Sequence, residues 1–335
     1  MTTLVTGGAG YVGSHTVVAL CAAGREVVIL DDFSNAKHGV VDALRALTGT
    51  QLDVVEADAA DRGAIEQICR SRDIDSIIHF AAHKSVPESV LEPLRYYRNN
   101  LASTLTLAEA ALERGIPRFV LSSSAVVYGG AAELPVTETS PLAPESPYGA
   151  TKQMCERILA DASADSRMRS VLLRYFNPVG AHPSGDIGEI PLSEPQNLVP
   201  VVMEVALGTR AKLQIFGDDY DTPDGTTIRD YIHVMDLAEG HVAALEADLG
   251  SCTSRAFNLG TGVGTSVHEV VRAASEVTQR EIPFDVIGRR PGDLAESWAD
   301  CRRAATELGW SAQRELKQML GDHWRFLRRH SSGTS

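Results

Sequence analysis

Short apolar runs rich in β-branched residues alternate with longer amphipathic segments through the first half of the chain. The longer segments carry apolar residues at the spacing of one helix face. Strands that alternate with helices predict right-handed βαβ crossovers, and therefore an α/β fold with a doubly wound parallel sheet. The expected strands contain Leu4–Val5, Val27–Leu30, Val54–Val55, Ile77–Phe80, Phe119–Leu121 and Val171–Leu173, and the expected helices contain Thr16–Ala23, Ala64–Cys69, Leu101–Leu112 and Met154–Ala162.

This alternation stops after Asn177, where a stretch rich in proline and glycine begins. Shorter helices and isolated strands follow, and 335 residues exceed the size of a typical small domain. We therefore expect a sheet domain over residues 1–177 and a smaller α/β domain over 178–330. Segments are expected to cross between the two, and residues 331–335 to form a frayed tail.

Composition and charge exclude several classes of function. Hydrophobic residues make up 44% and charged residues 22% of the chain, which is typical of a globular protein rather than a disordered one. The net charge of −13 argues against a nucleic-acid or anionic-membrane partner. The five scattered cysteines, without C-x-x-C spacing, predict a reducing compartment and neither a disulfide framework nor a zinc site. With no signal peptide or long apolar run recognisable, we expect a cytoplasmic protein.

A glycine-rich turn, Gly7-Gly8-Ala9-Gly10-Tyr11-Val12-Gly13, joins the first expected strand to the first helix. Glycines here allow a tight turn and close approach of a pyrophosphate, which the N–H groups of the helix N-terminus would bind. The G-x-x-G-x-x-G spacing alone is weak evidence, because structural turns share it. Asp31 strengthens it, since an acidic residue about 20 positions on can bind an adenosine ribose and repel a 2′-phosphate. NAD is therefore favoured over NADP, with Asp58 as an adenine contact or a turn residue.

A second group of polar residues follows the fifth expected strand. The strand ends in Ser122-Ser123-Ser124, at the sheet edge where open α/β folds bind ligands. Tyr148 and Lys152 are four residues apart on one expected helix, so both point from the same face. A lysine ammonium beside a phenol favours the phenolate and lowers its pKa. Such a pair is usually surface decoration, but beside a nucleotide site it predicts a catalytic base.

These residues belong to longer segments that resemble the extended short-chain dehydrogenase/reductase family and, within it, the UDP-glucose (UDP-galactose) 4-epimerases. The resemblance covers nearly the whole chain, and the sugar-nucleotide segments after Arg174 are its most specific part. The segments are Thr6–His15, Ile78–Ala82, Ser122–Gly129, Tyr148–Lys152, Arg174–Ala181 and Arg229–Asp236.

The resemblance implies a Rossmann-type NAD domain and 4-epimerisation of UDP-hexoses through a 4-keto intermediate. It implies Tyr148 as the base, Ser124 as a hydrogen-bond partner of the sugar 4′-oxygen, and Lys152 as the group that holds the tyrosine pKa down and binds the nicotinamide ribose. It also implies a homodimer paired near Leu101–Leu112 and Met154–Ala162. The implied cofactor contacts are Gly7, Gly10, Tyr11, Val12, Asp31, Asn35, Asp58, Phe80, Ala81, Lys84, Asn99, Tyr148, Lys152 and Phe176. The implied substrate contacts are Lys84, Ser124, Tyr148, Asn177, Asn197, Leu198, Phe216, Arg229, Tyr231, Arg290, Asp293 and Ser297.

One position departs from the family pattern. Many bacterial relatives resemble one another in placing a tyrosine four residues after Asp293, whereas this chain has Ser297 followed by Trp298. The resemblance implies that the side chain there borders the sugar 2′-position, so the chain is expected to accept UDP-N-acetylhexosamines as well, unless Trp298 turns inward.

Other interpretations remain open. A nucleotide-sugar 4,6-dehydratase needs an acid–base pair after Ser124, where this chain has Ala125 and Val126. A UDP-glucuronate decarboxylase fits less well downstream, and a non-catalytic NAD sensor would not need Ser124, Tyr148 and Lys152 together. His79, His233 and His241 lack metal-ligand spacing and are interpreted as structural, and Asp236 as a helix N-cap.

Overall fold

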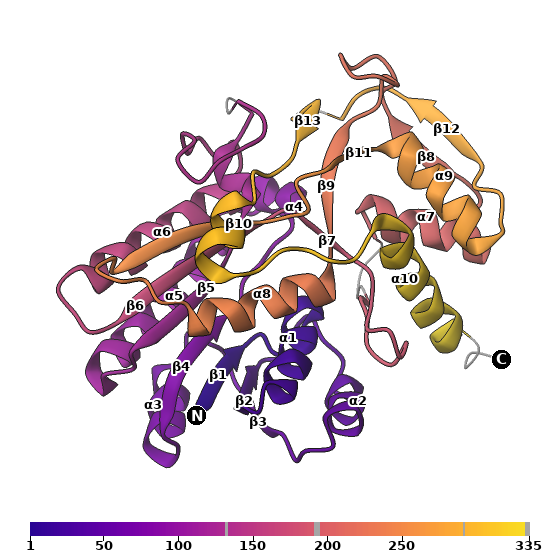
Figure 1. Cartoon of the computed structure of the whole chain (residues 1–335). Coiled ribbons are helices and arrows are strands. Elements are labelled where there is room, and N and C mark those ends of the chain that lie inside the picture. The colour runs from indigo at the N-terminus through magenta and orange to yellow at the C-terminus, as the bar shows by residue number, and fades with distance from the viewer. Residues whose placement is uncertain (131–132, 191–194, 291, 332–335) are drawn as a thin grey trace.

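The computed structural model describes residues 1–130, 133–190, 195–290 and 292–331. Its centre is a seven-stranded sheet in the order β10-β6-β5-β4-β1-β2-β3 (Figure 1). Every neighbouring pair in this sheet is parallel, which confirms the doubly wound fold expected from the sequence. The strands are β1 (Thr2–Thr6), β2 (Glu26–Asp31), β3 (Asp53–Glu56), β4 (Ile74–His79), β5 (Arg118–Ser124), β6 (Arg169–Tyr175) and β10 (Ser254–Leu259).

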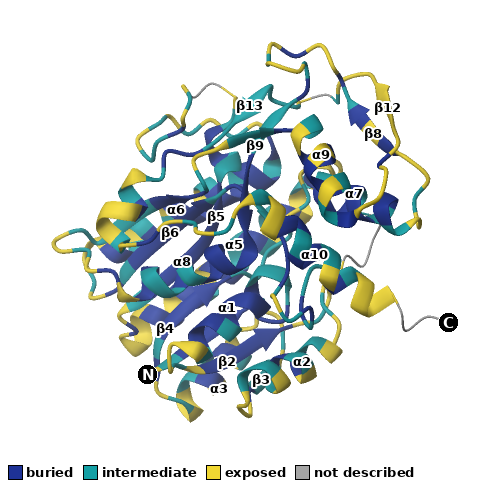
Figure 2. Cartoon of the chain, turned by 45° about the vertical axis from the view of Figure 1, so that its right-hand side comes forward, coloured by how far each residue is buried: buried dark blue, intermediate teal, exposed yellow. Residues whose placement is uncertain are grey.

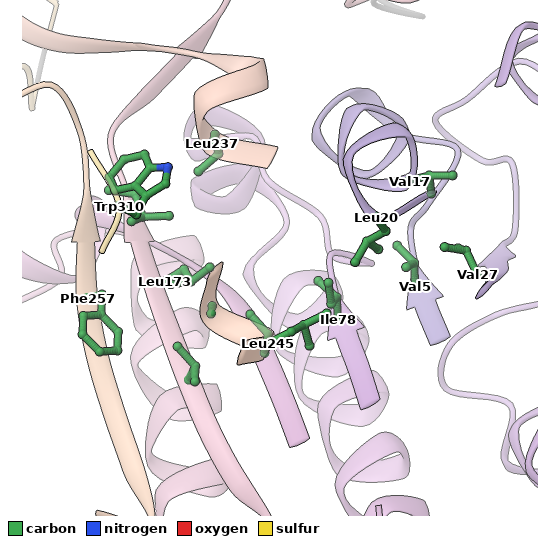
Figure 3. Packing of buried hydrophobic residues seen from close by; sticks show 14 of the residues in the cluster. Val5, Val17, Leu20, Val27, Ile78, Leu173, Leu237, Leu245, Phe257 and Trp310 are labelled. Atoms are coloured by element: carbon green, nitrogen blue, oxygen red, sulfur yellow. The ribbon is translucent and has the colours of Figure 1, made fainter. Parts of the chain in front are cut away.

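Helices cover both faces of this sheet, so its strands are buried on both sides (Figure 2). Neighbouring residues of one strand pack into different cores: Val5 packs with the helices of one face and Leu4 with those of the other. Figure 3 shows the first core, in which Leu20 and Leu245 approach the sheet from two helices. The helices of the first face are α1 (Tyr11–Ala22), α2 (Gly39–Thr48) and α8 (Val234–Glu246), and those of the second are α3 (Arg62–Ser71), α5 (Pro93–Arg114) and α6 (Pro147–Ala164). The short α4 (Val86–Leu91) precedes α5.

The second half of the chain builds a smaller unit beside the carboxyl edge of the sheet (Figure 1). Strand β9 is its centre, and pairs with β7, β11 and β13. Its apolar core lies among three helices and the strands β8 and β9. Its elements are β7 (Asn177–Val179), α7 (Leu198–Leu207), β8 (Leu213–Phe216), β9 (Ile228–His233), β11 (Gly264–Ser266), α9 (Val267–Thr278), β12 (Phe284–Ile287), β13 (Glu296–Ser297) and α10 (Leu316–Ser331).

The chain returns to the first sheet after leaving it, because α8 and β10 pack with the N-terminal elements. We therefore propose that α8 and β10 belong to the first unit, 1–177, although both lie in sequence within the second, 178–330. Residues 332–335 of the expected tail lie outside the described residues. None of the helices described here is long and apolar enough to cross a membrane.

The prediction that Asp236 caps a helix is wrong. Helix α8 begins at Val234, and the His233 ring caps it by accepting the Met235 N–H at 3.0 Å. Strand β9 runs into α8 without a loop, so the last strand residue occupies the capping position. Asp236 instead accepts the Arg314 backbone N–H at 3.0 Å and pairs with its guanidinium.

Candidate active site

The glycine-rich turn forms a cradle at the N-terminus of α1. Gly10 is the N-cap and has no side-chain capping bond, so the first N–H groups of the helix keep their binding capacity. Gly7 has a φ of +68°, and a Cβ at Gly13 would lie 2.1 Å from the Gly7 carbonyl oxygen. The backbone therefore packs too tightly here for side chains, as a pyrophosphate site requires. These residues fit the phosphates of NAD.

Asp31 ends β2 beside this cradle and is 7% exposed. Its Oδ2 accepts the Ala9 N–H and its Oδ1 accepts the Phe33 N–H, both at 2.9 Å. Burial raises the pKa of the Asp31 carboxyl, and these two hydrogen bonds oppose the rise. The carboxylate retains lone pairs for a ribose hydroxyl, so its position fits the predicted role.

The other predicted cofactor contacts are spread around this edge. Ala81 lies against the cradle, since a Cβ at Gly7 would be 2.8 Å from the Ala81 nitrogen. Phe80 follows β4, and Phe176 is buried beside Val127 and Tyr128. Asn35 and Asp58 are exposed, and Asp58 accepts the Ala60 N–H at 2.8 Å as a turn residue does. Val12 lies in the first turn of α1 and packs, partly buried, against the first core.

Two predicted residues connect elements across the site. The Tyr11 hydroxyl donates to the Gly180 carbonyl at 2.7 Å, which ties the cradle to the second unit. The Lys84 ammonium lies 3.4 Å from Glu189 and remains about half exposed, so a ligand can reach it. Asn99, on α5, donates to the Asn100 side chain at 3.1 Å.

Ser124, Tyr148 and Lys152 come together at the end of β5. Helix α6 begins at Pro147, and the Ser146 hydroxyl caps it, so Tyr148 and Lys152 lie one turn apart on its inner face. The Lys152 Nζ donates to the Ser122 carbonyl at 2.9 Å and lies 6.0 Å from the centre of the Tyr148 ring. Ser124 ends β5, and its hydroxyl lies near enough to the Tyr148 phenol to lower the pKa of that group.

The electrostatics of this group correct one prediction. Burial raises the pKa of Tyr148 to about 12, and the Ser124 hydroxyl partly lowers it. Burial also lowers the pKa of the Lys152 ammonium, which Cys155 and Glu156 oppose. The expectation that Lys152 lowers the pKa of the Tyr148 phenol toward working pH does not hold for the chain alone, in which burial has the largest effect on that pKa.

The predicted substrate residues form three separate groups. Ser297 and Arg229 are partners in the β13–β9 pairing, and Asn177 pairs with Tyr231 between β7 and β9. The Arg290 guanidinium covers the Phe216 ring at 4.1 Å. The Asp293 N–H donates to the Arg290 carbonyl at 3.2 Å, and Asn197 and Leu198 start α7.

Tyr231, predicted to contact the substrate, lies on β9 in the second unit. Its side chain is 7% exposed and packs in the apolar core of the second unit, with Val179 and Val199 among its members. The geometry therefore gives no support to a substrate contact by this residue.

The three histidines interpreted as structural are hydrogen-bonded inside the protein. His79 lies between Thr6 and Thr104, His241 bonds the Leu237 carbonyl, and His233 pairs with Asp322 at 3.2 Å. No cluster of three or more metal-ligating side chains occurs within the described ranges.

One functional feature escaped the sequence analysis. Glu156 lies four residues after Lys152 and accepts a hydrogen bond from Ser123 at 2.5 Å. The same helical spacing that linked Tyr148 to Lys152 could have identified it.

Comparisons with known proteins agree with this geometry. Residues 4–323 match the family described as GDP-mannose 4,6 dehydratase. A Bacillus subtilis protein named UDP-glucose 4-epimerase is 50% identical over 99% of this chain and 98% of its own length. A solved Stenotrophomonas UDP-glucose 4-epimerase, with bound NAD and formylated UDP-arabinopyranose, superposes with a TM-score of 0.97 at 44% identity over the whole of both chains. A UDP-Glc/GlcNAc 4-epimerase from Campylobacter jejuni superposes with a TM-score of 0.85 at 36% identity, over 98% of this chain and 99% of that one. The chain belongs to the GDP-mannose 4,6-dehydratase family and, within it, to the UDP-glucose 4-epimerases.

Proposed function

We propose that this protein interconverts UDP-glucose and UDP-galactose by NAD-dependent epimerisation at C4 of the sugar. The observation that carries the proposal is the convergence of three buried side chains at the end of β5: Ser124 ends the strand, and Tyr148 and Lys152 face it from one turn of α6. The glycine cradle and Asp31 lie along the same carboxyl edge of the sheet. Relatives that match this chain over nearly its whole length are named UDP-glucose 4-epimerase.

The residues divide the reaction between them. The Tyr148 phenolate takes the proton of the sugar 4′-hydroxyl, and Ser124 hydrogen-bonds the same oxygen. NAD⁺ held by the glycine cradle and Asp31 would accept the hydride from C4, and its positive nicotinamide ring would favour the phenolate that burial disfavours. After the keto sugar has turned, the reduced cofactor would return the hydride to the other face of C4 and Tyr148 would return the proton, so that protein and cofactor end each cycle unchanged. Lys152 contributes a positive charge beside the phenol ring.

The nucleotide must be held while the sugar turns. Arg229 and Arg290 suit the diphosphate, because guanidinium groups bind phosphate oxygens in pairs. Arg290 covers Phe216 in the structure, so binding of a uracil ring against Phe216 requires this side chain to move toward the phosphates. This movement would place the arginine charge where the substrate is negative.

Turnover of UDP-galactose by the purified protein tests the proposal. We expect UDP-glucose as the product, of unchanged mass, with Tyr148→Phe as the matched inactive control. A product lighter by water or carbon dioxide would indicate a dehydratase or a decarboxylase. Nucleotide binding without any turnover would indicate a sensor.

A second substrate pair, UDP-N-acetylglucosamine and UDP-N-acetylgalactosamine, is also proposed. Ser297 of β13 pairs with Arg229 of β9. Trp298 lies against β11, since a Cβ added at Gly264 would be 3.1 Å from the Trp298 ring. Adjacent strand residues point to opposite faces, so the indole leaves the side of Ser297 free. The Campylobacter relative is named for both kinds of substrate.

We also propose a cytoplasmic homodimer. Leu105 and Leu112 on α5 are 45% and 43% exposed, seven residues apart on one helix face, and Met154 on the adjoining α6 is 43% exposed. Apolar side chains on neighbouring helices suit a second copy of the same surface. Sedimentation of Leu112→Asp should give a monomer where the wild type gives a dimer.

All five cysteines are free, which supports a reducing compartment.

A further inference from the structure

A buried ion pair lies beside the catalytic residues. Arg174 on β6 and Glu156 on α6 are 5% and 4% exposed. Their Nη2 and Oε2 atoms are 2.6 Å apart, and the Arg174 Nε donates to Oε1 at 2.9 Å. Removing two charges from water is costly, and a buried pair often adds little stability. The position of the pair therefore needs an explanation other than stability.

Glu156 shares the inner face of α6 with both catalytic side chains, four residues beyond Lys152 and eight beyond Tyr148. Its Oε1 accepts the Ser123 hydroxyl at 2.5 Å. Lys152 meanwhile donates to the Ser122 carbonyl at 2.9 Å. The helix is thus fixed to β5 through the two residues that immediately precede Ser124.

The pair is itself fixed from its far side. The Arg174 Nη1 donates to the Tyr128 hydroxyl at 3.1 Å, and the guanidinium lies 5.1 Å from the centre of that ring. The Tyr128 hydroxyl donates to Asn258 on β10 at 2.6 Å, and Asn258 donates to the Val136 carbonyl at 2.8 Å. Neither charged side chain can shift without breaking several buried hydrogen bonds.

We infer that Glu156 and Arg174 are positioning residues for the epimerisation: they hold α6 against β5 so that the Tyr148 phenol stays on the Ser124 hydroxyl while the sugar reacts. This inference rests on the proposed function. It assigns neither residue a contact with substrate or cofactor.

The same carboxylate acts on the charge of Lys152. Burial lowers the pKa of Lys152, whereas Glu156 and Cys155 raise it. The other titratable groups near the ammonium are Tyr148 on α6 and His79 on β4, whose own pKa the lysine charge lowers. Without the carboxylate, Lys152 loses its proton at a lower pH, so the alkaline limb of the kcat profile should move to lower pH.

Glu156→Gln tests the inference, because it keeps the shape and removes the charge. We expect kcat per NAD-loaded chain to fall by about 10- to 100-fold, as for a slight misplacement of reacting groups, with KM changed by less than about threefold. The alkaline limb should move to lower pH, and the amount of nucleotide released on denaturation should match the wild type. Arg157→Ala, which breaks the exposed Arg157–Asp161 pair on the same helix, is the control and should leave kcat and the profile unchanged.

Two further variants keep the test decisive if Glu156→Gln folds poorly. Glu156→Leu with Arg174→Met removes both charges together, and should also lower kcat and shift the alkaline limb. Ser123→Ala leaves the pair intact but breaks its link to β5, and should lower kcat by about 2- to 10-fold. The inference would be overturned if these variants fold and keep the wild-type kcat and pH profile. It would also be overturned if their loss of activity equals their loss of NAD-loaded protein. A wild type without turnover of UDP-galactose would instead refute the proposed function.

Discussion

Gly13→Ala tests the cradle most stringently, because two effects oppose each other there. Position 13 lies within α1, where alanine is favoured over glycine by about 1 kcal/mol. The added Cβ would lie 2.1 Å from the Gly7 oxygen and 2.9 Å from the Gly8 Cα, inside the 3.0 Å limit of real Cβ contacts. Overpacking against backbone costs about 1–3 kcal/mol, so the steric effect wins. We expect a net loss of stability of up to about 2 kcal/mol.

Urea unfolding with and without NAD measures both consequences of this substitution. Wild-type protein should gain about 2.7 kcal/mol at a cofactor concentration 100 times Kd, and Gly13→Ala should gain far less, because Gly7 and Gly8 must move out of their phosphate-binding geometry. Gly321→Ala in α10 is the matched control: its Cβ would meet Val277 at an ordinary 3.8 Å, so it should stabilise by about 0.5–1 kcal/mol and leave the NAD effect intact. A Gly13→Ala protein as stable as the wild type, with an equal response to NAD, would refute this reasoning.

Three further predictions concern the catalytic edge. Tyr148→Phe should lose a factor of about 10² to 10⁴ in kcat while NAD still copurifies, as turnover assays and nucleotide release will show. Ser124→Ala removes the hydroxyl that lowers the pKa of Tyr148, so the acidic limb of the kcat profile should move to higher pH; an unmoved limb would contradict the assignment. Ser297→Tyr should lower kcat/KM for UDP-N-acetylglucosamine by at least about tenfold relative to UDP-glucose, consistent with about 1–3 kcal/mol for a change in pocket fit. Undiminished use of the acetylated sugar by the variant would show that Ser297 is not the gate.

The sequence predicted the local elements better than their arrangement. Apolar runs such as Val27–Leu30 identified strands because both faces of a parallel strand are buried. Such runs could not show that β10, which follows β6 by about eighty residues, pairs with β6 at the edge of the sheet. Strand order depends on contacts between residues that are distant in the chain. Asp236 was misassigned because β9 runs directly into α8, so the helix begins two residues before Asp236.

The site was predictable where spacing along one element determines it. Tyr148 and Lys152 share a helix face, and Asp31 ends the strand after the glycine turn, so their proximity follows from local structure. Burial does not follow from spacing. It raises the pKa of Tyr148 to about 12, and no pattern of residues in the sequence showed this effect.

The central claim is that one bound NAD oxidises and then reduces C4 of the same sugar, with Tyr148 moving the proton. Incubation of the purified protein with UDP-galactose deuterated at C4 tests it most directly. The account predicts UDP-glucose that keeps the deuterium at C4, without exchange into solvent and without added NAD, and conversion slowed by a factor of about 10² to 10⁴ in Tyr148→Phe. Loss of the label to water, or equal conversion by the variant, would contradict it.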